Sequence, residues 1–147
     1  MSLIDSTIII ADDLTGANDT ALQFFKKGCN TKIIIDCYQD FSDSNNVDVW
    51  AISTESRNAT KEEAVERVLL VANKLKESLG IENFYKKIDS TLRGNVGVEI
   101  IAMLEALQKE AAIIAPAYVE EGRITVGGYQ LLNNIPIERT QCALDPK

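Results

Sequence analysis

Two adjacent carboxylates, Asp12 and Asp13, follow a short apolar run and are the first residues of the chain that could do chemistry. Neighbouring carboxylates repel each other, so such a pair usually indicates a nearby cation, a substrate hydroxyl or a helix N-terminus. In a functional interpretation, at least one of them accepts a hydrogen bond from a substrate hydroxyl or removes its proton. In a structural one, one aspartate caps the helix that follows and the other is solvated.

The segment from Asp89 to Asn95 could hold an anion. Arg93 can form two parallel hydrogen bonds with a carboxylate or a phosphate, which a lysine cannot do. Gly94 lets the backbone approach a ligand closely, and the start of the predicted helix beyond it offers free N–H groups. The alternative is an ion pair between Asp89 and Arg93 beside an ordinary helix cap. Arg57 is a second candidate for anion binding.

Strand-like and helix-like segments alternate along the chain, which predicts an α/β fold. Specifically, we expect a three-layer αβα domain with a mostly parallel, Rossmann-like sheet of about five strands and a small β appendage. Strands are predicted at 7–11, 31–36, 47–53, 83–88 and 111–115, and helices at 17–27, 60–79 and 98–108. The 111–115 strand is expected to be buried. Short strands at 123–126 and 130–132, followed by a tight turn at Asn133-Asn134, form the appendage.

The unusual residues follow the carboxyl ends of these strands, which is where open parallel sheets bind ligands. We expect four loops to meet at one rim of the sheet. They carry Asp12 and Asp13 after the first strand, Ser53 and Arg57 after the third, Asp89, Arg93, Gly94 and Asn95 after the fourth, and Gly122 and Arg123 after the fifth.

Composition excludes several classes of protein. With 147 residues the chain suits one domain, and its net charge of −7 is unfavourable for binding nucleic acid or an anionic membrane. Having no histidine, the chain cannot use Ser-His or Cys-His nucleophiles. Three cysteines without C-x-x-C spacing indicate neither a disulfide framework nor a zinc site, and no metal site is expected. We expect a cytoplasmic protein.

Three blocks of sequence, taken together, resemble the four-carbon acid sugar kinase family. They are IADDLTGA at 10–17, KIDSTLRGN at 87–95 and EGRITVGGY at 121–129, and they occur in the family's order. The resemblance is to that family's N-terminal, sugar-binding domain, long catalogued as a domain of unknown function. It implies an ATP-dependent kinase that phosphorylates a hydroxyl of a threonate, erythronate or oxo-tetronate type of sugar acid.

The resemblance also implies roles for the rim residues. Asp12 and Asp13 would lie at the hydroxyl end of the substrate, one as candidate base, and Arg93 with Asn95 and the Gly94 backbone would hold the carboxylate end. The remaining candidates, which would line the cleft, are Ser53, Arg57, Asp89, Gly122 and Arg123.

In such kinases ATP and Mg²⁺ would be bound mainly by a C-terminal domain. We expect residues 1–147 to be the sugar-binding domain only, to lack that second domain, and to be inactive alone. A homo-oligomer is possible through the face that a missing domain would leave. A stand-alone module that binds a small anion or sugar acid without catalysis is the alternative function.

Overall fold

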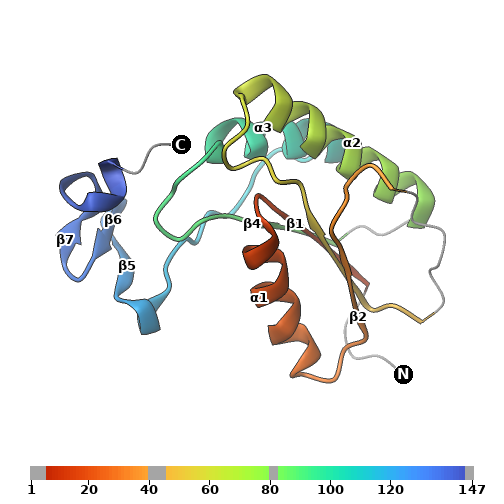
Figure 1. Cartoon of the computed structure of the whole chain (residues 1–147), viewed down its shortest axis with the longest axis horizontal. Coiled ribbons are helices and arrows are strands. Elements are labelled where there is room, and N and C mark those ends of the chain that lie inside the picture. The colour runs from red at the N-terminus through yellow and green to blue at the C-terminus, as the bar shows by residue number, and fades with distance from the viewer. Residues whose placement is uncertain (1–5, 40–45, 80–82, 145–147) are drawn as a thin grey trace.

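The computed structural model describes residues 6–39, 46–79 and 83–144. Its centre is a parallel sheet in the order β2-β3-β1-β4 (Figure 1). The strands are β1 (Thr7–Ala11), β2 (Thr31–Ile34), β3 (Val49–Ser53) and β4 (Asn83–Lys87), and the helices are α1 (Leu14–Phe25), α2 (Lys61–Leu79) and α3 (Val96–Leu107).

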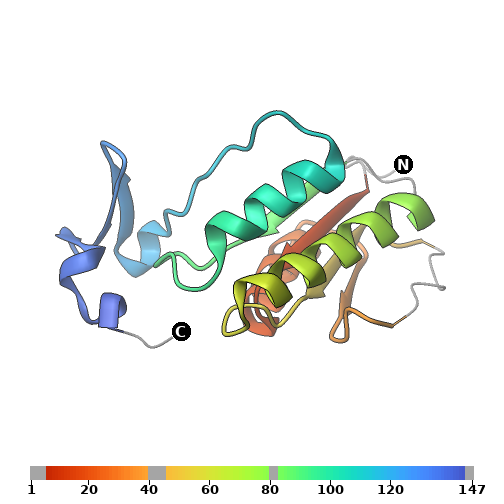
Figure 2. The same cartoon turned by 90° about the horizontal axis from the view of Figure 1, so that it is seen from above.

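The helices cover both faces of the sheet, as the three-layer prediction requires (Figure 2). Side chains of a strand point alternately to opposite faces, so β1 contributes to two separate cores. Ile9 and Ala11 pack with Ala17 and Ala21 of α1. The α2 and α3 face holds a larger cluster, made of Ile8, Ile10, Ile34, Cys37, Trp50, Ile52, Val68, Val71, Ala72, Leu75, Ala102 and Met103.

Local hydrogen bonds fix where two of the helices begin. Thr60 and Glu63 form the reciprocal capping box that their spacing indicates, and α2 starts at the next residue, Lys61. Asp13 caps α1 by accepting a hydrogen bond from the Gly16 amide at 2.8 Å. This cap places the start of α1 three residues earlier than the apolar spacing suggests.

The prediction of a buried fifth strand at 111–115 is wrong. This stretch follows α3 as an extended segment that belongs to no strand, and all five of its residues are exposed. A short apolar run predicts a strand only if a neighbouring strand is there to pair with it, and none of the described strands does so.

A small antiparallel sheet forms the C-terminal appendage. It consists of β5 (Arg123–Val126), β6 (Tyr129–Leu132) and β7 (Ile135–Pro136), with single 3₁₀ turns at Val119–Glu121, Ile137–Arg139 and Gln141–Leu144. Asn133 and Asn134 have φ angles of 51° and 65°, the left-handed pair that a tight hairpin turn requires. Buried Gln130 anchors the appendage by donating to the Ser90 carbonyl oxygen at 2.7 Å.

Within the described ranges, no helix is long and apolar enough to span a bilayer.

Candidate functional site

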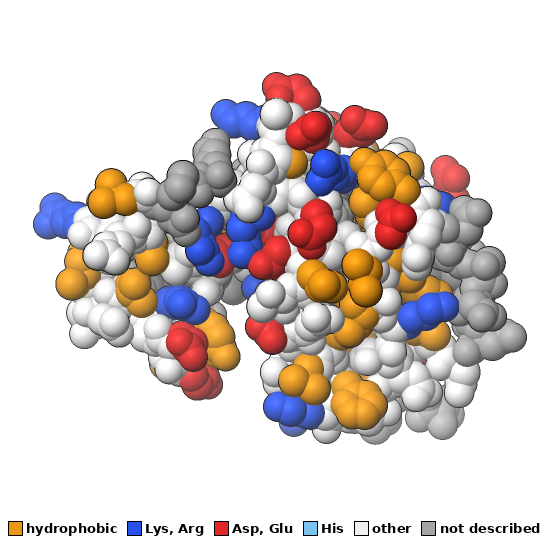
Figure 3. All heavy atoms as spheres, viewed as in Figure 1, with side chains coloured by type: hydrophobic (Ala, Val, Ile, Leu, Met, Phe, Trp, Pro, Cys, Tyr) orange, Lys and Arg blue, Asp and Glu red, His pale blue; other side chains and the backbone are white. Residues whose placement is uncertain are grey.

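The register of the sheet brings three candidate loops to one edge. Ala11, at the end of β1, is the partner of Ser53 in β3 and of Lys87 in β4. The three strands therefore end level, and the residues that follow them emerge side by side. Figure 3 shows acidic and basic side chains gathered where the appendage meets the α/β unit.

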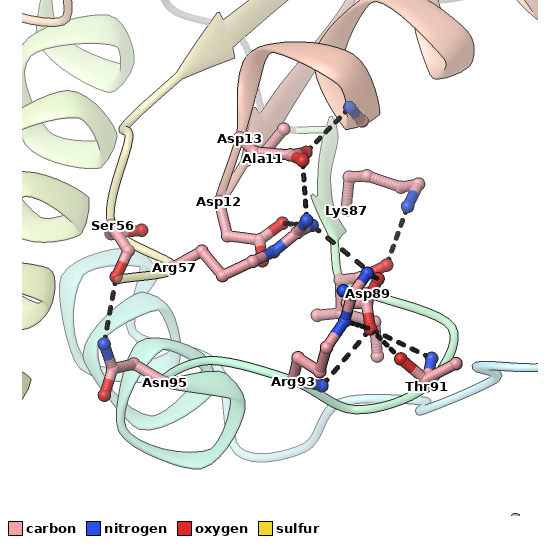
Figure 4. A network of polar contacts seen from close by, with 12 residues as sticks. Ala11, Asp12, Asp13, Ser56, Arg57, Lys87, Asp89, Thr91, Arg93 and Asn95 are labelled. Atoms are coloured by element: carbon pink, nitrogen blue, oxygen red, sulfur yellow. Dashed lines mark hydrogen bonds and ion pairs between the residues drawn. The ribbon is translucent and has the colours of Figure 1, made fainter. Parts of the chain in front are cut away.

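Arg57 is the centre of this cluster (Figure 4). Its Nε and Nη2 donate to the two oxygens of Asp12 at 2.8 and 3.2 Å, and its Nη1 lies 2.6 Å from Asp13 Oδ2. A longer ion pair of 3.8 Å reaches Asp89. Burial disfavours the charged guanidinium, but the hydrogen bond with Asp12 and the three carboxylate charges outweigh it and raise the pKa of Arg57.

Asp89 and Arg93 form the ion pair that was the structural alternative for this loop. The Arg93 guanidinium binds in the forked geometry, with Nε 2.9 Å from Asp89 Oδ2 and Nη2 3.0 Å from Oδ1. Thr91 also donates to Asp89 through its hydroxyl and its backbone amide. Although burial raises the pKa of Asp89, the hydrogen bonds from Arg93 and Thr91 lower it well below the usual range.

Asn95 is buried and holds the backbone of the neighbouring loop. Its side-chain amide donates to the carbonyl oxygens of Ser56 and Ala59, each at 2.9 Å. The Ser56 hydroxyl in turn donates to buried Glu99 of α3 at 2.6 Å, and Glu99 pairs with Lys86 of β4 at 2.7 Å. These bonds fix the residue that precedes Arg57, so they set where the guanidinium sits.

A cavity of about 540 Å³ opens beside the arginine cluster. The α/β unit contributes Arg57, Asn58, Thr91, Leu92, Arg93 and Gly94 to its wall, and the appendage contributes Ile137, Glu138, Cys142 and Ala143. At Gly94, where φ is +85°, a side chain would meet the Arg57 backbone at about 3.2 Å, so glycine allows this close approach.

The other candidate residues lie at different distances from the cavity. Asp12 and Asp13 reach its wall only through Arg57 and are not among the lining residues. Ser53 is buried and bonds to Glu55. Arg123 donates to the Ser90 hydroxyl at 3.2 Å, next to Asp89, while Gly122 packs against Asn133 in the appendage.

Sequence reasoning gave no role to several residues that shape this site. Glu99 and Lys86 form a buried pair that the sequence did not signal, because the apolar spacing of Ile101, Leu104 and Leu107 predicts the other face of the helix as buried, whereas Ile101 is exposed and Glu99 is buried. Glu138 and Cys142 line the cavity because the appendage lies against the loop between β4 and α3, and no local pattern indicates that docking.

Comparison with known proteins identifies the class to which this fold and site belong. A family model described as "Sugar-binding N-terminal domain" matches residues 7–147. The D-erythronate kinase of Heliobacterium modesticaldum is 46% identical over 98% of this chain, and the D-threonate kinase of Salmonella typhimurium is 41% identical over 95%. The chain belongs to the sugar-binding N-terminal domain family of the four-carbon acid sugar kinases, which confirms the resemblance.

A solved structure supports the same assignment. A domain of unknown function from Bordetella bronchiseptica, with bound citrate and described as a domain-swapped dimer, superimposes with a TM-score of 0.88. It is 35% identical, and the match covers 95% of this chain and 36% of that one. The chain likewise spans 33% of the length of both kinases named above.

Proposed function

We propose that this chain binds a four-carbon sugar acid of the threonate, erythronate or 3-oxo-tetronate type as the substrate-binding part of an ATP-dependent kinase. The reaction would transfer a phosphoryl group to a hydroxyl of that acid. The observation that carries the proposal is the pair of guanidinium groups, Arg57 and Arg93, in the wall of one cavity. The relatives named as D-erythronate and D-threonate kinases support a hydroxylated carboxylate as the ligand of these two groups.

The roles within the cavity follow from charge and position. The Arg93 guanidinium and the Gly94 backbone would hold the substrate carboxylate, because a planar fork of N–H donors matches it. Asn95 would support them from behind through the Ser56 and Ala59 carbonyls that it already binds. The citrate in the Bordetella relative, another hydroxylated carboxylate, fits this chemistry.

Asp12 and Asp13 would orient the reactive hydroxyl at the other end of the substrate. Asp13 is the better candidate base, since its side chain is 22% exposed against 3% for Asp12. Phosphoryl transfer depends mainly on positioning and charge stabilisation, with a carboxylate near the attacking oxygen. Ser53 and Gly122 do not line the cavity, and Arg123 would act only indirectly, through the Ser90 hydroxyl next to Asp89.

The described residues do not fit a Mg²⁺-ATP site. The cluster's carboxylates, those of Asp12, Asp13 and Asp89, all pair with Arg57, and in the described ranges no group of acidic residues or cysteines could hold a metal ion. We therefore assign ATP and Mg²⁺ to a C-terminal domain and expect residues 1–147 to bind the acid without phosphorylating it. The full kinase would form a homo-oligomer, as the Bordetella relative does.

A thermal-shift screen tests the proposal. The ligands are D-threonate, D-erythronate and 3-oxo-tetronate, with erythritol as an uncharged control. A ligand at 100 times its Kd stabilises a protein by about 2.7 kcal/mol. For a domain of this size that is a rise in melting temperature of about 5–10 °C. Arg93→Ala should abolish the shift, while Lys109→Ala, an exposed cation at the end of α3, should retain it.

Each result has a defined meaning. A shift with one sugar acid, lost only in Arg93→Ala, would name the substrate. A shift that survives in Arg93→Ala would refute the assigned role of that arginine. No shift with any of the acids would refute binding by this chain. Phosphorylation of an acid by the isolated chain with ATP would refute the assignment of the nucleotide to another domain.

A further inference from the structure

The sheet has an open edge at β4. Among the described strands, β4 pairs only with β1, so the backbone N–H and C=O groups on its other side meet no strand. Tyr85 projects from β4 on the α1 face of the sheet, level with Ile9, and is 47% exposed. An unpaired strand edge with an exposed aromatic side chain is a template for a further strand.

The extended segment at 110–117 lies beyond this edge. It follows α3, and Figure 2 shows it on the side of β4 away from β1. Between Glu110 and Ala117 no backbone group bonds to the backbone of another described residue; Gln130 alone donates to the Pro116 carbonyl oxygen. Ile113 is 99% exposed and Ile114 is 56% exposed. In this segment neither the backbone hydrogen-bonding groups nor the apolar side chains of Ile113 and Ile114 have a partner among the described strands.

The connection through α3 sets the direction in which the segment 110–117 runs. A helix that leaves the carboxyl end of one strand returns the chain to the amino end of the sheet, so 110–117 runs in the direction of β4. The segment has the composition and direction of a parallel strand, yet it does not pair with β4. We propose that the position between β4 and residues 111–115 is filled by a β-strand from outside this chain. That strand would bond to the β4 edge and cover Tyr85 and Ile113.

The occupant is a strand from the C-terminal two thirds of a family kinase. The relatives are about three times as long as the matched region, since the chain covers 33% of each of two of them. The remaining two thirds of such a kinase would supply one strand for each copy of this domain. The strand would come either from the same polypeptide or from a second polypeptide by exchange. A second copy of this chain is the competing occupant. This inference rests on the open edge and on family membership, and it holds or fails independently of the identity of the sugar acid.

Hydrogen–deuterium exchange tests the proposal in two proteins. One is this chain alone; the other is a chimera in which it replaces the matched third of the Heliobacterium modesticaldum D-erythronate kinase. In the chimera, the amides of 111–115 and of one side of β4 should exchange at least ten times more slowly. Exchange at equal rates in a chimera that melts cooperatively would overturn the proposal. The proposal would also be overturned if the chimera does not fold and this chain does not co-purify with the remaining two thirds of that kinase.

Two variants separate docking from folding. Ile113→Asp should leave the melting temperature of the isolated chain unchanged, because this side chain is almost fully exposed, yet it should remove the protection in the chimera. Phe25→Asp is the matched control, an exposed apolar residue at the end of α1, and should keep the protection. A dimer of the isolated chain that Ile113→Asp dissociates, measured by light scattering, would show that the occupant is a second copy.

Discussion

Removing the Arg57 guanidinium is the most direct test of how the acidic cluster is held together. The side chain is 18% exposed and joins the carboxylates of Asp12, Asp13 and Asp89. In Arg57→Ala three negative charges would face one another with Arg93 as their remaining partner in the cluster. We expect the variant to fold, with a clearly lower free energy of unfolding.

The expected size follows from the burial of the partners. Breaking a buried ion pair by deleting one member typically costs about 3–5 kcal/mol, because the other charge is left uncompensated. Asp12 is nearly inaccessible, but the Asp13 side chain is 22% exposed and water can solvate it. We therefore expect a loss of about 3 kcal/mol after this solvent screening. For a domain of this size the melting temperature would fall by about 6–12 °C.

Urea unfolding followed by tryptophan fluorescence measures this loss. Trp50 is the chain's single tryptophan and is 1% exposed in the core, so its emission reports global unfolding. Arg139→Ala is the matched control, because Arg139 is exposed and pairs with no carboxylate in the part of the chain that the structure describes. Arg57→Lys should recover part of the loss, since an ammonium keeps the charge without the forked contact to Asp12.

One result would refute this reasoning. The control Arg139→Ala should have a free energy of unfolding within about 1 kcal/mol of the wild type. If Arg57→Ala does as well, the three carboxylates do not need the guanidinium for stability. A double-mutant cycle with Asp12→Asn gives a second check. Because the two groups are in contact, the double variant should lose less than the sum of the single losses, and simple additivity would contradict a direct interaction.

Three further predictions concern the groups around the cluster. Glu99→Ala should lower the free energy of unfolding in urea by about 3 kcal/mol, because it leaves the Lys86 ammonium buried without its carboxylate. A loss no larger than that of a surface variant would contradict this prediction. Asp89 has a lowered pKa in the folded protein, so its stabilisation is complete above about pH 4 and is lost at lower pH. Asp89→Asn should accordingly show a shallower loss of stability on acidification from about pH 5 to pH 3 than the wild type. Iodoacetamide should alkylate Cys142, which lines the cavity, before Cys37, where burial raises the pKa of the thiol, and a bound sugar acid should slow the reaction at Cys142.

The sequence predicts the parts of the fold that depend on local chemistry. The β-branched run of β1 identifies a strand buried on both faces, and the spacing of Thr60 and Glu63 gives the start of α2 to within one residue. The rim also follows, because parallel strands joined by helices bring their carboxyl ends to one edge. The prediction of a strand at 111–115 is wrong because this strand does not depend on local chemistry alone. Its pairing depends on a partner strand, and composition carries no information about that partner.

The sequence predicts which residues make up the candidate site, but not which of these residues pair with one another. Spacing places Asp89 and Arg93 on one loop, yet it cannot say whether the guanidinium meets that aspartate or a ligand. The structure has the internal pair because Leu92, with a φ of 60°, turns the loop so that Arg93 folds back onto Asp89. The cavity wall from the appendage is still less predictable, since it depends on the long-range bond between Gln130 and Ser90.

The charges of the cluster decide how an anionic substrate can be held. Arg57 and Arg93 are balanced by Asp12, Asp13 and Asp89, and the chain carries a net charge of −7, so no long-range field attracts an anion. In the complex that we propose, a sugar acid would share the guanidinium of Arg93 with Asp89, which already accepts from Nε and Nη2. We expect this sharing to make binding to the isolated chain weak, and binding to be tighter in the proposed full-length kinase if a further part of it closes the cavity and excludes water.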